Sequence, residues 1–178
     1  MIYKESGLVF DFSGEHWVVK AFDRHPYYKA LSGHGFKGVD FLGLFEDSQL
    51  VCMEVKNYRN LPSTDPVEFI QFLESESRVV RQKMEDTLRI IDLIDQYHHR
   101  KWLFRLFKPF VSQYPRFFRE WGFWSRAKTL SENPLNCRFV WWIDTSLTID
   151  PDLWQAFAAN ALQGKHPLEI QYPGLSIL

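Results

Sequence analysis

The stretch at residues 37–59, KGVDFLGLFEDSQLVCMEVKNYR, constrains the fold more than any other part of the chain. It contains two apolar runs, residues 39–45 and 50–57, which flank the polar residues 46–49. Short apolar runs with β-branched and aromatic residues on either side of a polar turn are typical of a β-hairpin. The sequence therefore predicts two antiparallel strands here.

Charged residues interrupt both of these runs. Asp40 lies in the first run, and Glu54 and Lys56 lie in the second. Burial of a charge is costly unless the charge is paired or holds a metal. Because side chains alternate along a strand, Glu54 and Lys56 project from the same face. The charges indicate either a functional site or a solvent-facing strand edge with a cross-strand ion pair.

An acidic residue on one strand and Glu-x-Lys on the next suit metal-dependent cleavage of phosphodiester bonds. Carboxylates are the hard oxygen ligands that Mg²⁺ prefers. The ion polarises the scissile phosphate and lowers the pKa of an attacking water. A neighbouring Lys stabilises the negative charge that develops on the phosphate.

Gly38-Val39-Asp40 and Glu54-Val55-Lys56 carry a resemblance to a known family. On these residues the sequence resembles the PD-(D/E)XK nuclease superfamily, which has the restriction-endonuclease-like fold. The following Asn57-Tyr58 is similar to nuclease-related domains whose motif continues past the Lys. Val39 replaces the Pro that precedes the Asp in the family. The resemblance covers about the first third of the chain, and the rest follows only in the order of its elements.

The resemblance implies a site for Mg²⁺ or Mn²⁺. Its ligands would be Asp40, Glu54 and the main-chain carbonyl of Val55, and Lys56 would act beside the attacking water. The family often carries a Glu on its first helix that completes the metal site, and Glu15 is the candidate here. The alternative for Glu15 is a surface residue favoured by the helix dipole.

Other polar residues are further candidates near this site. The resemblance implies that the helix after the Glu-x-Lys strand presents polar residues to it, which makes Gln82 and Lys83 candidates. His34 and Lys37 lie in a glycine-rich connection before Asp40, where substrate contact is one interpretation. A solvated surface is the alternative for all four residues.

The remaining pattern predicts an α/β fold: a single domain over residues 1–178, with a central mixed β-sheet flanked by helices on both faces. The resemblance implies that this is a nuclease-like domain with a restriction-endonuclease-like core. A helical, aromatic-rich insertion is expected at about residues 98–130. The other expected elements are a helix from Ser13 to residues 23–25, a strand at 27–31, a helix from an Asp65 cap and Pro66 to residue 97 (whole or broken at 75–77), a strand at 137–144, a helix from Pro151 to residue 163 and an edge strand at 168–172.

The net charge of −1 conceals a segregation of charge along the chain. Residues 100–128 hold eight Lys and Arg against one acidic residue, whereas residues 40–95 hold twelve acidic and six basic residues. Basic residues interleaved with aromatic rings suit nucleic acid, because cations neutralise phosphates and rings stack on bases. The expected contacts are Arg116, Arg119, Arg126 and Lys128. An amphipathic helical hairpin with a solvated basic face and a membrane-surface segment are the alternatives.

The rest of the composition indicates a cytoplasmic protein. Cys52 and Cys137 lack the spacing of metal ligands and are expected to be reduced thiols in the core. The sequence shows no signal-peptide pattern and no apolar run near the ~20 residues that span a bilayer. The oligomeric state stays open, with a homodimer among the options.

Three functions follow from these observations. The first is a Mg²⁺-dependent nuclease, with DNA as the favoured substrate. The second is a catalytically inactive module of the same fold that binds nucleic acid or assists assembly. The third is a membrane- or partner-binding protein that acts through residues 100–128.

Overall fold

A β-hairpin lies at the centre of the fold, as the sequence predicts. In the computed structural model, β4 (Phe41–Phe45) and β5 (Gln49–Asn57) pair antiparallel. The turn between them contains Glu46 and Asp47, both with positive φ angles, 51° and 53°. The structure describes residues 1–14, 16–61, 65–100, 119–161 and 168–171.

The hairpin is extended on both sides into a mixed sheet of five strands in the order β3-β4-β5-β6-β7. β3 (Trp17–Ala21) is antiparallel to β4. On the other side, β6 (Cys137–Asp144) is parallel to β5, and β7 (Leu168–Gln171) is parallel to β6. The mixed sheet and the strands expected at residues 137–144 and 168–172 are therefore confirmed, the second over the described residues 168–171.

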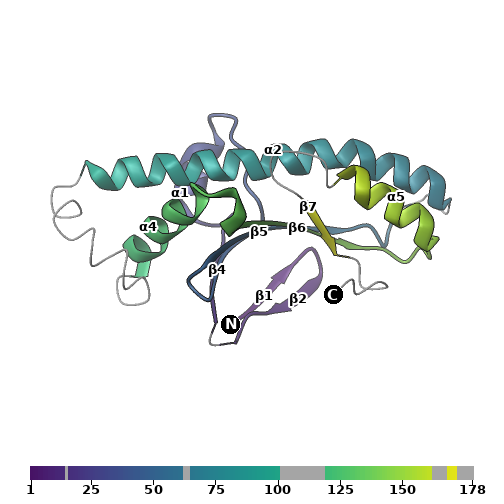
Figure 1. Ribbon diagram of the computed structural model, residues 1–178, viewed down its shortest axis with the longest axis horizontal. Coiled ribbons are helices and arrows are strands. Elements are labelled where there is room, and N and C mark those ends of the chain that lie inside the picture. The colour runs from purple at the N-terminus through teal and green to yellow at the C-terminus, as the bar shows by residue number, and fades with distance from the viewer. Residues whose placement is uncertain (15, 62–64, 101–118, 162–167, 172–178) are drawn as a thin grey trace.

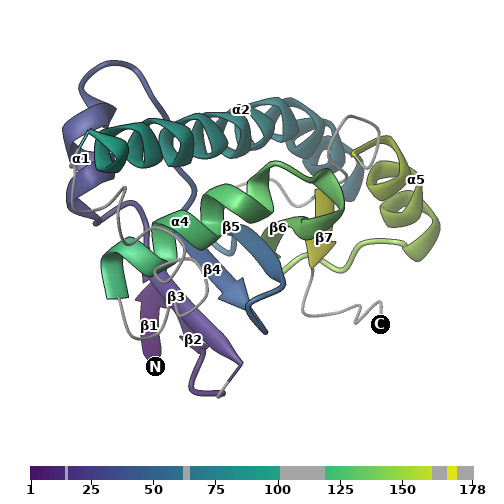
Figure 2. The same cartoon turned by 60° about the vertical axis from the view of Figure 1, so that its left-hand side comes forward.

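The helices lie together on one side of this sheet (Figure 1). The longest helix, α2 (Pro66–His99), crosses the sheet (Figure 2). Helix α4 (Arg119–Ser131) packs against the C-terminal half of α2, and α5 (Pro151–Ala161) packs against its N-terminal half. The remaining described helices are α1 (Pro26–Ser32) and a short 3₁₀-helix, η1 (Pro134–Asn136), before β6. Within the described residues, no helix combines the length and the apolar composition that crossing a membrane requires.

The opposite face of the sheet is covered by a second hairpin, formed by β1 (Ile2–Glu5) and β2 (Leu8–Asp11) (Figure 1). The expectation of helices on both faces is thus wrong for the described residues. The physical reason is that β1 and β2 supply the apolar cover with aromatic side chains. Tyr3 and Phe10 pack against Phe41 with ring centroids 5.4 and 5.5 Å apart.

Many of the described aromatic side chains lie in the layer between the sheet and the helices. Trp124 of α4, Trp141 of β6 and Trp154 of α5 are fully buried there. Cys52 and Cys137 are free and buried in the same layer, as expected. Burial raises the pKa of both thiols, and that of Cys137 lies at about 11.

Helix α2 begins where the sequence predicts. The Asp65 carboxylate accepts a hydrogen bond of 2.9 Å from the main-chain N–H of Val67, with Pro66 in the first turn. The helix is not broken at residues 75–77, which was one of the two alternatives; it is continuous from Pro66 to His99. The hydroxyls of Ser75 and Ser77 donate to main-chain carbonyls within the helix, which satisfies them without a break. Asp150 caps α5 in the same way as Asp65 caps α2.

Two elements near the N-terminus differ from the prediction. The helix expected from Ser13 is instead the strand β3, because its residues are covered on both faces. Val18 packs toward the helices, whereas Val19 packs toward the β1–β2 hairpin. The strand expected at residues 27–31 is instead α1, where Nδ1 of His25 accepts a hydrogen bond of 3.3 Å from the main-chain N–H of Tyr27.

Candidate functional site

The pairing of β4 with β5 determines where the predicted acidic residues lie. Phe41 pairs with Met53, so Asp40, one residue earlier, lies opposite Glu54. Cross-strand partners share a face of the sheet. Residues 46–48 form a three-residue turn, and a turn of two or four residues would have placed Asp40 on the other face. The register that a shared site requires is therefore present.

The Asp40 side chain is held in place by the neighbouring strand. Its Oδ2 atom accepts a hydrogen bond of 2.7 Å from the main-chain N–H of Val55. Burial, and then the nearby charge of Glu54, raise the pKa of Asp40 to about 7. Asp40 and Glu54 therefore repel each other in the ion-free protein.

Glu54 is 1% exposed and is shared by two lysines. Its Oε1 atom lies 2.6 Å from Nζ of Lys83, which comes from α2, and 3.4 Å from Nζ of Lys56. Its Oε2 atom is buried and makes no hydrogen bond to any residue that the structure describes. Burial alone lowers the pKa of Lys83, but the charge and hydrogen bond of Glu54, together with Asp40, raise it overall.

A single turn of α2 fixes the segment that leads into Asp40. The Thr87 hydroxyl accepts a hydrogen bond of 3.1 Å from the N–H of Val39 and donates to the carbonyl of Lys83. Asp86 accepts a hydrogen bond from the N–H of Lys37 at 3.2 Å. The helix thus positions Lys83 and the strand entrance together.

Gly38 is required at this entrance because the chain passes close to α1. A Cβ atom at this position would lie 2.7 Å from the ring of Tyr28. The other residues expected in the glycine-rich connection, His34 and Lys37, are exposed, and so is Gln82 on α2.

Further acidic residues lie beside the candidate site without forming part of its ion pairs. Glu5, at the end of β1, forms a 2.7 Å ion pair with Arg24. Asp23 follows β3, and burial and the charge of Glu5 raise its pKa. The sequence pattern gave no signal for Glu5 or Asp23, because these residues come from strands whose pairing was not predicted.

The carboxylate oxygens of the site meet part of what a divalent cation requires. The buried, unpaired Oε2 atom of Glu54 opposite a second carboxylate fits a cation. Among the described residues, no three His, Cys, Asp or Glu side chains converge on one ion. Glu15, expected to complete the set, lies outside the described residues. Val55 contributes its N–H to Asp40, and its carbonyl remains the third ligand that the resemblance implies.

The predicted nucleic-acid contacts are described only in part. Arg116 lies outside the described residues, and so does the side chain of Arg119, the first residue of α4. Nε of Arg126 donates a hydrogen bond of 2.7 Å to the carbonyl of Asp47, so its guanidinium is bound to the β4–β5 turn. Lys128 forms ion pairs with Asp92 at 2.8 Å and with Glu132 at 3.5 Å. Both described cations thus have partners within the protein.

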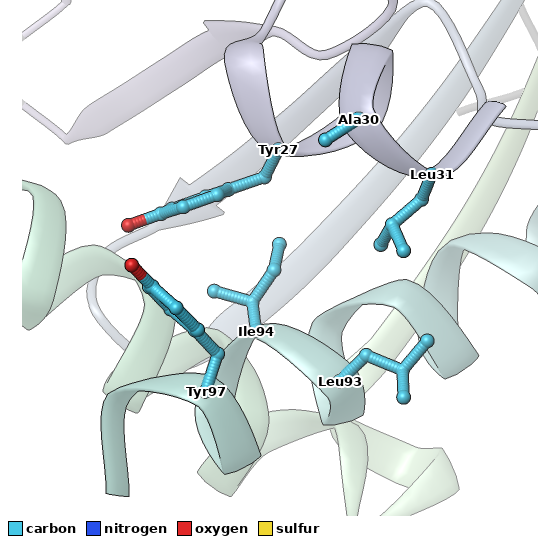
Figure 3. Close-up of a pocket in the computed structure, with 6 residues that line it drawn as sticks. All are labelled: Tyr27, Ala30, Leu31, Leu93, Ile94 and Tyr97. Carbon is cyan, nitrogen blue, oxygen red and sulfur yellow. The ribbon is translucent and has the colours of Figure 1, made fainter. Parts of the chain in front are cut away.

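An apolar cavity of about 390 Å³ lies between α1 and α2 (Figure 3). Two tyrosines, Tyr27 and Tyr97, face each other across one end of it, and the hydroxyl of Tyr27 is hydrogen-bonded to Nε2 of His98 at 2.8 Å. None of its lining residues belongs to the group formed by Asp40, Glu54, Lys56 and Lys83. The cavity is therefore separate from the candidate site.

Comparison of the chain with protein-family models, with curated protein sequences and with solved structures gave no match.

Proposed function

We propose that the chain is a divalent-cation-dependent nuclease of the PD-(D/E)XK type, with Mg²⁺ or Mn²⁺ as its ion and DNA as its substrate. One observation supports this above the others. The hairpin register brings Asp40 opposite Glu54, and Glu54 keeps one buried carboxylate oxygen without a partner among the described residues. A buried carboxylate oxygen without a partner is costly, and a bound cation would remove that cost.

The residues have distinct roles in this proposal. Asp40 and Glu54 would hold the ion, and the Val55 N–H fixes the orientation of the Asp40 carboxylate. The ion supplies Lewis-acid polarisation of the phosphate when it is bound. Lys56 shares a face with Glu54 and is 28% exposed, so its ammonium group is accessible to a phosphate. It would stabilise the negative charge that develops during cleavage.

The second candidate function is a non-catalytic module that binds nucleic acid or assists assembly. The contact between Lys83 and Glu54 favours it, because a 2.6 Å ion pair satisfies one carboxylate oxygen without any metal. The lack of a third converging acidic side chain among the described residues also favours it. The two functions differ in whether the protein binds a divalent ion.

The test measures ion binding and cleavage in the same variants. Wild-type protein, treated with a chelator and then given Mg²⁺ or Mn²⁺, should cleave single- or double-stranded DNA. Glu54→Ala should lose both ion binding and cleavage. Lys56→Ala should keep ion binding, since Lys is not a ligand, but lose about 10²-fold or more in rate.

Two exposed residues provide matched controls. Glu85→Ala removes an acidic residue from α2, and Lys29→Ala removes a basic residue from α1; both variants should behave as wild type. Wild-type rates in Lys56→Ala would contradict the assigned chemistry. Wild-type protein that neither binds the ion nor cleaves would leave the non-catalytic module as the function.

A further inference from the structure

Lys83 pairs with Glu54, the same carboxylate that would bind a divalent ion in the proposed function. Its Nζ lies 2.6 Å from Oε1 of Glu54, closer than the 3.4 Å of Lys56. Its side chain is 22% exposed and also interacts electrostatically with Asp40. Lys83 is therefore the main positive charge that faces both carboxylates.

The position of Lys83 is fixed by the helix that carries it. Its carbonyl accepts a hydrogen bond of 2.8 Å from the hydroxyl of Thr87, which also binds the strand entrance through Val39. The lysine and the carboxylates are thus parts of one packed unit. An ion bonded to the other oxygen of Glu54 at about 2.0–2.6 Å would lie within about 7 Å of Nζ.

The charges of the site balance without an ion. Asp40 and Glu54 carry two negative charges when ionised, and Lys56 and Lys83 carry two positive charges. A divalent ion would bring the site to a net charge of two positive units. A phosphate of the substrate is the group that offsets this excess.

We infer that Lys83 acts as an internal cation that neutralises Glu54 in the ion-free protein and weakens divalent-ion binding until a phosphate backbone is present. This inference rests on the proposed nuclease function. Lys83 is a positioning residue: it orients Glu54 so that Oε2 faces the ion position. By thermodynamic linkage, nucleic acid tightens ion binding and the ion tightens nucleic-acid binding by the same factor.

The first measurement is calorimetric titration with Ca²⁺, which binds oxygen ligands and allows binding to be measured apart from turnover. Lys83→Gln keeps a hydrogen-bond donor but removes the charge, so it should bind Ca²⁺ at least about tenfold more tightly than wild type. Lys83→Arg keeps the charge and should bind like wild type. Arg78→Gln removes the same charge from an exposed position on α2 and should change little.

The second measurement compares wild type with Lys83→Gln in the presence of DNA. A short DNA duplex and the corresponding single strand are added at saturation, and Ca²⁺ affinity is measured again. At least one DNA form should tighten Ca²⁺ binding, and Lys83→Gln should show a smaller effect.

The outcomes separate this inference from the proposed function. If wild type binds Ca²⁺ but Lys83→Gln binds it equally or more weakly, the role of Lys83 is refuted and the nuclease proposal stands. An absence of DNA coupling in wild type that binds Ca²⁺ also refutes it. If folded wild type and Lys83→Gln both fail to bind Ca²⁺, Mg²⁺ and Mn²⁺, the proposed function itself is wrong.

Discussion

Substitution of Asp40 by Asn should stabilise the ion-free protein at alkaline pH. Asn keeps the oxygen that accepts the hydrogen bond from the Val55 N–H, but it removes the negative charge that burial, and then Glu54, disfavour. A raised folded-state pKa means that the fold favours the protonated carboxyl. The stability that Asp40 contributes is thus fully present below about pH 4 and is lost as the pH rises through about 7.

The magnitude follows from the pKa of Asp40. A rise from 3.8 to about 7 is about 3 units, and each unit corresponds to about 1.4 kcal/mol, which gives an upper bound of about 4 kcal/mol. Because Asp40 keeps partial access to solvent, we expect about half of this, or about 2 kcal/mol, at pH 8. For a chain of this size, that difference raises Tm by about 4–8 °C.

The assay is urea and thermal unfolding of wild type and Asp40→Asn in chelator, at pH 4.5 and pH 8. The variant should be more stable than wild type at pH 8, and the two should be nearly equal at pH 4.5. Mg²⁺ should then stabilise wild type but not the variant. Asp92→Asn is the control, and its expected effect on stability is opposite. The hydrogen bond from Lys128 lowers the pKa of Asp92, so this variant should be less stable than wild type at pH 8. Equal destabilisation of Asp40→Asn at both pH values would refute the raised pKa of Asp40.

Two further substitutions test the surroundings of the site. Gly38→Ala places a Cβ atom 2.7 Å from the ring of Tyr28, so it should lower the free energy of unfolding by about 1–3 kcal/mol in urea titrations; unchanged stability would contradict this close approach. Arg126→Gln should lose about 1–3 kcal/mol because its hydrogen bond to the Asp47 carbonyl is removed. This variant should also leave the salt dependence of DNA binding unchanged. If the slope of log binding constant against log salt concentration became shallower by about 0.9, Arg126 would contact a phosphate instead.

The hairpin and the start of α2 were predictable because local signals agree there, whereas the register of the hairpin was left open by the sequence pattern. An Asp followed by a Pro favours a helix start, and both Asp65-Pro66 and Asp150-Pro151 begin helices in this chain. Two apolar runs around a short polar turn leave few registers, and a site shared by Asp40 and Glu54 selects among them. Asp40 and Glu54 are only 14 positions apart in the chain, and the three-residue turn between β4 and β5 places them opposite each other.

The elements that were mispredicted depend on contacts with distant residues. β3 is covered by helices on one face and by the β1–β2 hairpin on the other, so its apolar residues do not alternate with polar ones. Such a short run cannot be distinguished from a helical segment by periodicity alone. The contact of Lys83 with Glu54 joins residues 29 positions apart, and only the packing of α2 over the sheet determines it.

The connection between β5 and β6 has a consequence for the order in which the protein folds. Leu50 pairs with Cys137, 87 positions later, so this parallel ladder requires the closure of a long loop. The β4–β5 hairpin closes over a three-residue turn, and short loops close much faster than long-range pairings form. We therefore expect Asp40 and Glu54 to face each other early, before α2 docks. Docking of the helix then brings Lys83 to Glu54 late in folding, and this positive charge reduces, without removing, the repulsion between the two carboxylates.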